Sequence, residues 1–320
     1  MAEKKVFFTE FKAMGTDIFA AINCGDKKYA ELEFENIKSE ISVFENRFSR
    51  FKKDSELSKL NKSAGGFFQA SDEMIELLLC AKEAYEITNG IFDPAVLPIL
   101  EKIGYNQDFD KIKEGIKKIS KKQIQKDFSN LPKFEDIVID NRNKIVKLPQ
   151  GVKIDLGGIA KGFIIDRIVM RLRNKFENFW ISAGGDMYLF GRDSENKNWQ
   201  VGVQNPLEHS QDILFLNIPT RGAAAATSGI TKRKGKSGNF VWHHLIDPRT
   251  GLPADNDILA ATVIADSVWQ ADVLAKTALI LGKKEGIDFL GEIPNAGGLL
   301  IDENLEILFS KGIKDYVIEK

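Results

Sequence analysis

Hydrophobic positions in the first part of the chain recur with the spacing of strands and helices. Residues 6 to 23 alternate as two strands that are interrupted by the turn sequence MGT. Apolar residues then return every three or four positions, which predicts one face of an amphipathic helix: Phe34, Ile37, Ile41, Phe44 and Phe48. A second helix is predicted from the N-cap Ser71 to a stop near Gly90, and the following IFDP predicts a turn at Asp93 into a short helix.

The rest of the chain mixes hairpins with helices. DIVIDNRNKIVKLP predicts a hairpin around residues 141–143, and GVKIDLGGIAKGFIIDRIVMRL predicts a strand, a glycine turn and a helix. FWISAGGDMYLFG predicts two strands joined at Gly184-Gly185. Short strands predominate from 199 to 265, a helix is predicted from about Ser267 to Leu281, and GGLLIDENLEILF predicts a closing hairpin. Because strands and helices do not alternate regularly, an α+β fold is favoured over a doubly wound sheet.

Composition indicates a globular chain with a substantial core. The chain has 320 residues, of which 43% are hydrophobic and 28% charged, so it needs no metal or disulfide to stabilise a core. No repeat or low-complexity linker divides it, which predicts one compact unit and leaves a division into two lobes open. Cys24 and Cys80 are too few and too far apart for a disulfide scaffold, and we expect both to be buried small apolar residues.

Charge and hydropathy exclude two classes of partner. The 45 lysines and arginines against 46 acids give a formal net charge of −1, so no overall basic field attracts nucleic acid. The lysines between 111 and 126 lie above isoleucines at helical spacing, and we expect them to form a solvated helix surface. No window approaches the roughly 18 apolar residues of a membrane helix, and no signal-peptide pattern opens the chain. We therefore expect no membrane insertion and a cytoplasmic location.

The sequence KIDLGGIAKG has the arrangement of an anion site, with a strand, a glycine turn and a helix N-terminus. It matches neither GxxxxGK[ST] nor GxGxxG, so the motif alone is weak, and two glycines at a tight turn also serve helix packing. Lys161 has two interpretations, as a neighbour of a bound phosphate or as a solvated helix residue. We count it among the candidate cofactor-binding residues.

Two adjacent histidines, in the sequence VWHHLIDPRTGLPA, are the clearest candidates for proton transfer. Adjacent residues of a strand point to opposite faces, so only one of His243 and His244 can enter a given cleft. An imidazole titrates near neutral pH and commonly deprotonates a hydroxyl. The alternative is a histidine whose hydrogen bonds are satisfied at a sheet edge.

Asp272 stands on an otherwise apolar helical sequence. Such an acid either faces solvent or is committed to a buried partner such as a cation. Carboxylate and carbonyl oxygens suit Mg²⁺, whereas Zn²⁺ requires more histidine or cysteine than this chain offers.

Taken together, these segments resemble the ApbE family, the FAD:protein FMN transferases. The resemblance runs in the family's order through AMGT, SRFKKDSELSKLN, GIFDPAV, IDLGGIAKG, ISAGGD, AAATSG, HHLIDPRTG and ADVLAKTALILG. It implies an α+β fold with a mainly antiparallel sheet core and packed helices, as one ApbE-like domain over residues 1–320. It also implies transfer of FMN from FAD to a threonine or serine hydroxyl of a protein acceptor, with release of AMP. The pattern D-[GA]-x-[ST]-[SG]-A-T, typical of acceptors, is absent from this chain, so self-modification is not expected.

The resemblance also implies roles for individual residues. His244 corresponds to the histidine that we expect to act as the base. Asp272 matches the carboxylate that binds Mg²⁺, and Ala160 matches the residue whose main-chain carbonyl binds the same ion. The FAD contacts that the resemblance implies are Met14, Phe51, Ile91, Phe92, Asp93, Gly157, Phe163 and Ile246. Lys161, from the glycine turn, is counted with them as a candidate contact.

Lys276 departs from the family pattern. The family places a metal-binding threonine four residues after the aspartate, whereas this chain has Lys276 there and Thr277 one position later. A residue at i+5 is rotated about 100° from i+4, so Thr277 cannot simply substitute. Either the metal site is altered with Lys276 taking part of the charge, or Lys276 points into solvent and Asp272 still binds Mg²⁺; we favour a metal site. The alternative functions are FAD pyrophosphatase and a non-catalytic FAD-binding protein.

Overall fold

The computed structural model describes residues 5–103, 121–128, 131–231, 234–237 and 240–318, and these form two compact units. The first unit consists of Met1–Glu45, Lys161–Ser228 and Asp257–Lys320, and the second of Asn46–Ala160 and Gly229–Asn256. Most of the lysine-rich segment predicted as a helix lies outside the described residues. None of the helices within the described ranges is both long and apolar enough to cross a membrane.

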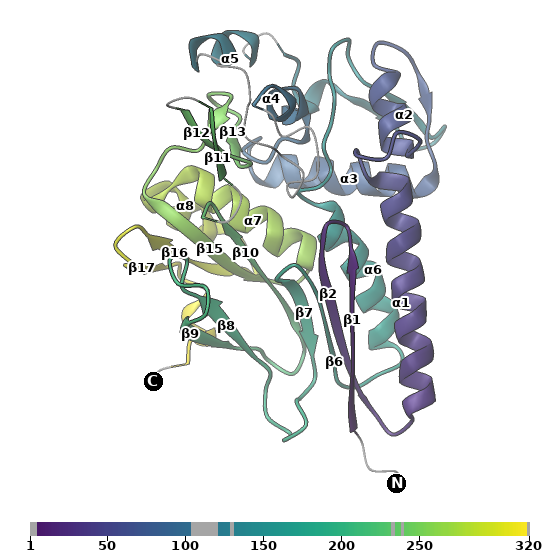
Figure 1. Ribbon diagram of the computed structural model, residues 1–320, viewed down its shortest axis with the longest axis vertical. Helices are drawn as coiled ribbons and strands as arrows, with labels where there is room; N and C mark the ends of the chain where they lie inside the picture. The colour runs from purple at the N-terminus through teal and green to yellow at the C-terminus, as the bar shows by residue number, and fades with distance from the viewer. Residues whose placement is uncertain (1–4, 104–120, 129–130, 232–233, 238–239, 319–320) are drawn as a thin grey trace. The chain divides into compact units, whose positions relative to one another are not determined.

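The first unit is built on an eight-stranded sheet (Figure 1). Its strands, in spatial order, are β1 (Lys5–Ala13), β2 (Thr16–Cys24), β6 (Phe179–Ala183), β7 (Asp186–Phe190), β10 (Ala223–Gly229), β15 (Ile258–Ala265), β16 (Gly297–Asp302) and β17 (Ile307–Phe309). Neighbours pair antiparallel from β1 to β10 and again from β15 to β17. The predicted α+β fold with a mainly antiparallel sheet is therefore confirmed.

Two of the predicted hairpins close through two-residue turns with both residues in the left-handed region. Met14 and Gly15 have φ of 53° and 68° between β1 and β2, and Gly184 and Gly185 have φ of 67° and 100° between β6 and β7. A turn of this kind matches the right-handed twist of the strands that it joins. The glycine pair therefore fixes the position at which Asp186 begins β7.

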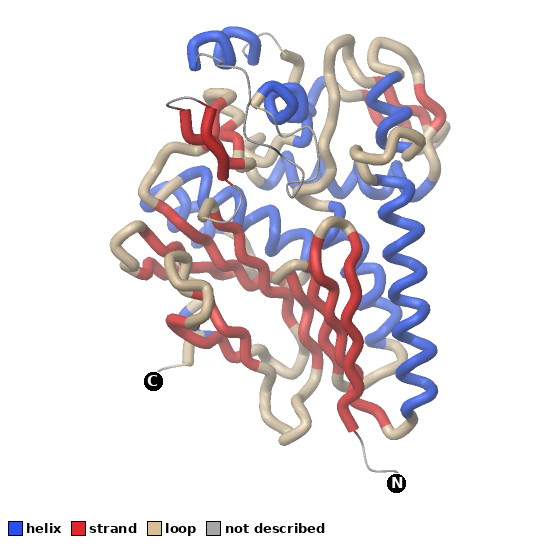
Figure 2. The backbone as a smooth tube through the Cα atoms, viewed as in Figure 1, coloured by secondary structure: helices blue, strands red, loops and turns tan. Residues whose placement is uncertain are grey.

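Helices and a second hairpin cover the sheet of the first unit. The helices are α1 (Lys27–Phe48), α6 (Ala160–Arg173), α7 (Val268–Leu281), α8 (Lys283–Glu292) and η4 (Lys314–Tyr316), and the hairpin consists of β8 (Gln200–Gln204) and β9 (Asp212–Asn217). Helices α7 and α8 pack against β15 and β16. Figure 2 shows the strands of this sheet in red and the helices in blue.

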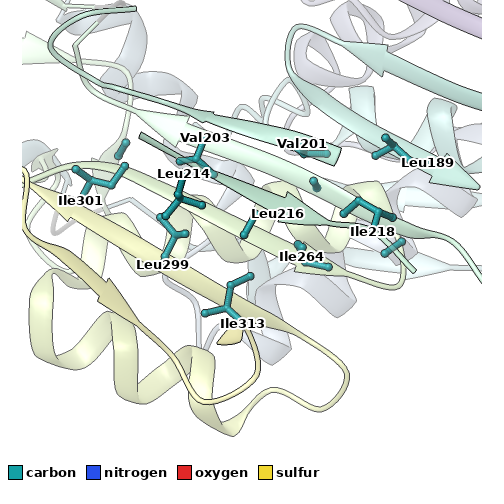
Figure 3. Close-up of a cluster of buried hydrophobic side chains, with 13 residues drawn as sticks. Leu189, Val201, Val203, Leu214, Leu216, Ile218, Ile264, Leu299, Ile301 and Ile313 are labelled. Atoms are coloured by element: carbon teal, nitrogen blue, oxygen red, sulfur yellow. The ribbon is translucent and has the colours of Figure 1, made fainter. Parts of the chain in front are cut away.

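Both faces of β16 are covered, which explains why all six of its residues are buried. Leu299 and Ile301 join the apolar cluster formed with the β8–β9 hairpin (Figure 3). Leu300 lies between them on the strand and therefore points to the opposite face. There a Cβ atom at Gly286 of α8 would lie 3.2 Å from the Leu300 side chain. Leu300 therefore packs under α8.

The second unit consists of short helices and small sheets. Its helical elements are α2 (Glu56–Lys62), α3 (Asp72–Ile87), η1 (Pro94–Val96), α4 (Leu97–Lys102), α5 (Lys121–Phe128) and η3 (Phe134–Asp136). Its strands are β3 (Phe68–Gln69), β4 (Val138–Asp140), β5 (Ile145–Lys147), β11 (Lys234–Ser237), β12 (Phe240–His243), β13 (Ile246–Asp247) and β14 (Leu252–Pro253). The predicted N-cap is confirmed, because the Ser71 hydroxyl accepts a hydrogen bond from the Met74 amide at 3.2 Å.

The strand predicted in GVKIDL is wrong, since residues 152–156 belong to no helix and pair in no sheet. The Asn61 side chain accepts from the Ile154 amide at 2.8 Å and donates to the Ile154 carbonyl at 2.9 Å. The Asp155 amide donates to the Pro94 carbonyl at 2.8 Å. A side chain and a neighbouring turn therefore satisfy backbone groups that a second strand would otherwise bind.

Helices α6 and α7 of the first unit meet at a close crossing. A Cβ atom at Gly162 would lie 2.4 Å from the backbone nitrogen and Cα of Trp269, so the backbones approach as closely as glycine permits. Beside this contact, the Asp166 carboxylate accepts hydrogen bonds from the amides of Val268 and Trp269 at 2.8 and 3.0 Å. Asp166 thus caps the N-terminus of α7 from another helix.

Substituting Gly162 by alanine should destabilise the protein, because the added methyl group meets backbone atoms rather than a flexible side chain. We expect a loss of about 1–3 kcal/mol in the free energy of unfolding, the usual cost of overpacking. Gly291→Ala is the matched control, since no atom lies within 4 Å of a Cβ atom at that position of α8. Urea unfolding of both variants measures the difference; equal stabilities would contradict the close crossing.

The buried Asp166 cap should make the stability of the protein depend on pH. Burial raises the pKa of Asp166 from 3.8 to about 7, against the opposing effect of its two backbone hydrogen bonds. Asp166 therefore binds a proton more tightly in the folded state than in the unfolded state. The stability that this bound proton contributes is fully present below pH 4 and is lost as the pH rises to 7. The loss amounts to at most about 4 kcal/mol.

Asp166→Asn cannot titrate, so the difference in unfolding free energy between the native protein and this variant isolates the effect. We expect the native protein to become less stable relative to Asp166→Asn as the pH rises from 4 to 7.5. Urea unfolding at several pH values measures it, and a difference that does not change with pH would contradict the assignment.

Candidate active site

In the first unit, two lysines and two aspartates form a cluster, called here the lysine–aspartate cluster: Lys161, Asp186, Asp272 and Lys276. The Lys161 ammonium at the start of α6 donates to Asp186 Oδ2 on β7, and its Nζ lies 3.7 Å from Asp272 Oδ2. Lys276 Nζ donates to Asp272 Oδ1, one helical turn away on α7. Three elements distant in sequence thus bring together two positive and two negative charges.

The cluster is largely shielded from water. The side chains of Lys161 and Lys276 are 17% and 14% exposed, and those of Asp186 and Asp272 are 6% and 3% exposed. Burial, together with the neighbouring charge of Asp272, raises the pKa of Asp186. Burial also disfavours the charged form of Asp272, but the ammonium groups of Lys161 and Lys276 outweigh it and lower the pKa of that carboxyl.

Asp186 is not among the candidate residues that the sequence predicted. The signal was present in ISAGGD, where an acid directly follows a glycine turn at the start of a strand with an apolar side. The alternative in which Lys276 points into solvent is wrong, because its ammonium is turned onto Asp272. The expectation for Thr277 agrees with the structure: its buried hydroxyl donates to the Val273 carbonyl at 2.9 Å and is thus used within the helix.

The lysine–aspartate cluster does not fit a Mg²⁺ ion. Mg²⁺ requires about six oxygen ligands in near-octahedral geometry. Asp272 Oδ1 already accepts from the Lys276 ammonium, and the Lys161 ammonium lies 3.7 Å from Oδ2. A divalent ion on Asp272 would also lie beside ammonium groups, with a repulsion of several kcal/mol for each of them.

Two further candidate residues belong to the first unit. Met14 lies in the β1–β2 turn, where its amide donates to Glu45 Oε2 at 2.8 Å. This bond holds the turn at a non-glycine residue with positive φ. Phe163 is half-buried on α6 and stacks on Phe44 of α1 with ring centroids 6.0 Å apart. Both residues therefore have defined positions.

In the second unit, the predicted turn at IFDP is confirmed. The Phe92 amide donates to the Thr88 hydroxyl at 3.0 Å, and Asp93 Oδ1 accepts from the Ala95 amide at 2.7 Å, so Asp93 caps η1. Ile91, Phe92 and Asp93 are all buried. Burial raises the pKa of Asp93 to about 6, despite its bond to the Ala95 amide.

The turn at IFDP is joined to the glycine turn through Asp155. The Asp155 amide donates to the Pro94 carbonyl, while Asp155 Oδ1 accepts from the Gly157 amide at 2.8 Å. Arg50 Nε lies 3.2 Å from Asp155 Oδ2, and the Arg50 guanidinium lies 4.2 Å from the centroid of the Phe51 ring. Three candidate segments are thereby linked within one unit. Arg50 and Asp155 are not among the candidate residues that the sequence predicted.

The two histidines occupy different environments, as their adjacency in the sequence predicts. His243 is 7% exposed, and its Nε2 lies 2.9 Å from the Ala254 carbonyl. Its Nδ1 accepts from the Leu245 amide at 3.3 Å, so Nε2 carries the proton and donates to Ala254. Burial lowers the pKa of His243. His243 therefore has a structural role, whereas the half-buried His244 remains the candidate base.

The segment after the histidines is fixed by Asp247. Its carboxylate accepts from the Arg249 amide at 2.8 Å and from Arg249 Nε and Nη2 at 3.0 Å, and its carbonyl accepts from the Gly251 amide at 2.8 Å. Gly251 has φ of 70°, and a Cβ atom there would lie 2.5 Å from the Phe128 ring. The preceding Ile246 is buried in an apolar cluster with Leu97, Ile99, Leu100, Ile103 and Ile124.

Ala160 begins α6, and its amide donates to the Leu156 carbonyl at 2.8 Å. Met14, Lys161, Phe163 and Asp272 belong to the first unit. The other candidates belong to the second unit: Phe51, Ile91, Phe92, Asp93, Gly157, Ala160, His244 and Ile246.

Known proteins match this chain along nearly its whole length. A protein of Klebsiella pneumoniae (strain 342) named FAD:protein FMN transferase is 26% identical over 315 residues, which cover 97% of this chain and 93% of that protein. A protein of Treponema pallidum (strain Nichols) with the same name is 27% identical over 280 residues, covering 82% and 75%.

Solved structures share the fold. The crystal structure of the ApbE protein from Thermotoga maritima superimposes with a TM-score of 0.87 at 26% identity, covering 98% of this chain and 100% of that one. The flavin transferase ApbE from Vibrio cholerae gives a TM-score of 0.81 at 22% identity, covering 98% and 99%. The match to the ApbE family covers residues 14–300, a range that includes residues of both units. The chain therefore belongs to the ApbE family.

Proposed function

We propose that this chain transfers FMN from FAD to a threonine or serine hydroxyl of a protein acceptor, forming a phosphoester bond and releasing AMP. The observation that carries the proposal is the match, over 97% of the chain, to a relative named FAD:protein FMN transferase. The family match includes both units, which supports the prediction of one ApbE-like domain. The cytoplasmic location and the absence of a nucleic-acid partner stay predictions.

The proposed reaction forms one bond and breaks another at a single phosphorus atom. The acceptor hydroxyl oxygen bonds to the phosphorus of the FMN half, and the bond from that phosphorus to the bridging oxygen breaks. AMP leaves with the bridging oxygen, and the hydroxyl proton passes to His244. A positioned base removes such a proton as the new bond forms.

The FAD contacts in this proposal are Met14, Phe51, Ile91, Phe92, Asp93, Gly157, Lys161, Phe163 and Ile246. What supports them is local order: Asp155 ties the glycine turn to both the Asp93 turn and Arg50, which stacks on Phe51. A turn held in this way loses little entropy on binding FAD. The Mg²⁺ ion expected at Asp272 and Ala160 has no support in the lysine–aspartate cluster, and no step of the proposed reaction depends on it.

Separation of products tests the proposal. The purified chain is incubated with FAD and a model protein that carries the D-[GA]-x-[ST]-[SG]-A-T sequence, and flavin and nucleotide are followed by mass spectrometry and chromatography. We expect a covalent FMN adduct on the acceptor and one AMP for each adduct. An acceptor whose threonines and serines in this sequence are replaced by alanine is the control and should stay unmodified. Free FMN with AMP would indicate FAD pyrophosphatase, and unchanged FAD a binding protein; either contradicts the proposal.

His244→Ala should lower the rate of transfer about 10²- to 10⁴-fold, the usual contribution of a positioned base. FAD affinity should stay nearly unchanged, because the imidazole acts on the acceptor proton. His243→Ala is the matched control: it removes bonds to Ala254 and Leu245, and we expect lower stability with a much smaller loss of transfer. AMP release in a single turnover and FAD fluorescence measure the two effects. Equal losses of rate in two folded variants would show that the base is misassigned.

A further inference from the structure

The lysine–aspartate cluster bears on how the proposed reaction obtains positive charge. We propose that the ammonium group of Lys276, together with that of Lys161, stands in for a divalent cation at Asp272, so that this chain transfers FMN without binding Mg²⁺ there. The proposal rests on the proposed function, in which Asp272 lies at the position of the metal carboxylate.

The geometry leads to Lys276 because it is turned inward. It follows Asp272 by one helical turn, so both side chains share one face of α7. Its side chain is 14% exposed, and its ammonium donates to Asp272 Oδ1. A lysine has four rotatable bonds and normally extends into water. Here the side chain reaches back to a carboxylate that is only 3% exposed.

Charge compensation explains the inward position. A buried carboxylate left without a partner costs several kcal/mol, so Asp272 requires a cation. Lys276 meets this need on Oδ1, and Lys161 lies 3.7 Å from Oδ2 while also binding Asp186. The two carboxylates and two ammonium groups have no net charge. A divalent ion at Asp272 would therefore find Oδ1 occupied by Lys276 and the Lys161 ammonium 3.7 Å from Oδ2, so that two positive charges would lie beside it.

The same ammonium can serve the leaving group. An ammonium has three N–H donors, and the bond to Asp272 uses one of those of Lys276. The bond that breaks leaves charge on the bridging oxygen of AMP, which N–H donors from an ammonium stabilise as a metal ion does. The acceptor proton still passes to His244, so the reaction requires no additional reagent.

Direct metal binding tests the inference without any turnover. Mn²⁺, which is visible by electron paramagnetic resonance, is titrated into the full chain with and without FAD. We expect no stoichiometric binding by the native protein. Lys276→Thr frees Asp272 Oδ1 and adds a hydroxyl ligand, so this variant should bind one Mn²⁺ with an affinity about 10- to 100-fold above that of the native protein. Lys284→Thr, the same change at an exposed position of α8, is the control and should match the native protein.

Turnover gives the second measurement. Native AMP release in the presence of acceptor should be the same in EDTA and in Mg²⁺, whereas Lys276→Thr should require Mg²⁺. Stoichiometric Mn²⁺ binding by the native protein, or a native activity that EDTA abolishes and Mg²⁺ restores, would overturn the inference. If Lys276→Thr does not fold, Lys276→Met removes the charge alone; transfer in EDTA at the native rate by this variant would also overturn it.

Separate experiments test the proposed function and the role of Lys276. If no condition yields the FMN adduct, the proposed function is wrong. The Mn²⁺ titration of the native chain and of Lys276→Thr still decides whether the ammonium occupies the metal position.

Discussion

The close contact of α6 with the N-terminus of α7 is the constraint on which the lysine–aspartate cluster depends. Gly162 lets the two backbones approach, and Asp166 holds the first amides of α7. Lys161 precedes Gly162 by one residue, and Asp272 lies one turn into α7. A fixed crossing therefore places the ammonium and the carboxylate near each other without a loop that could move. Gly162, the last residue of the KIDLGGIAKG sequence, therefore has a packing role in helix α6.

This arrangement also determines which charges must be compensated. Helix α7 is apolar on nearly all sides because it packs under β15 and β16, so a carboxylate at Asp272 cannot reach water. Asp186 starts a strand of the same sheet and is also buried, so its carboxylate cannot reach water either. Two buried acids at one place require two cations or an ion of higher charge. The sequence provides the cations as lysines on the two helices that cross there.

Strand-like alternation and the three- or four-residue spacing of helices predicted most of the elements, because most of these elements are amphipathic or bounded by strong turn signals. The hairpin at Met14-Gly15, helix α3 with its Ser71 cap and helix α7 are examples. The failures depend on tertiary partners. Residues 152–156 look like a strand, but their polar groups bind Asn61 and Pro94. Helix α8 is short and was not predicted. Asp186, Arg50 and Asp155 could not be grouped, because only folding brings their partners close.

The role of Lys276 shows how far a resemblance to a family can be carried. The resemblance assigns a position, whereas the physics of that position depends on the residue present. A threonine hydroxyl is a neutral ligand that adds an oxygen to a metal site, and a lysine brings a charge that competes with the metal. Lys276 bonds to Asp272 Oδ1, and its positive charge at that place opposes the approach of a metal ion to either oxygen of the carboxylate. In this chain a lysine charge therefore stands beside the buried Asp272 at the position where the family pattern has a neutral threonine hydroxyl.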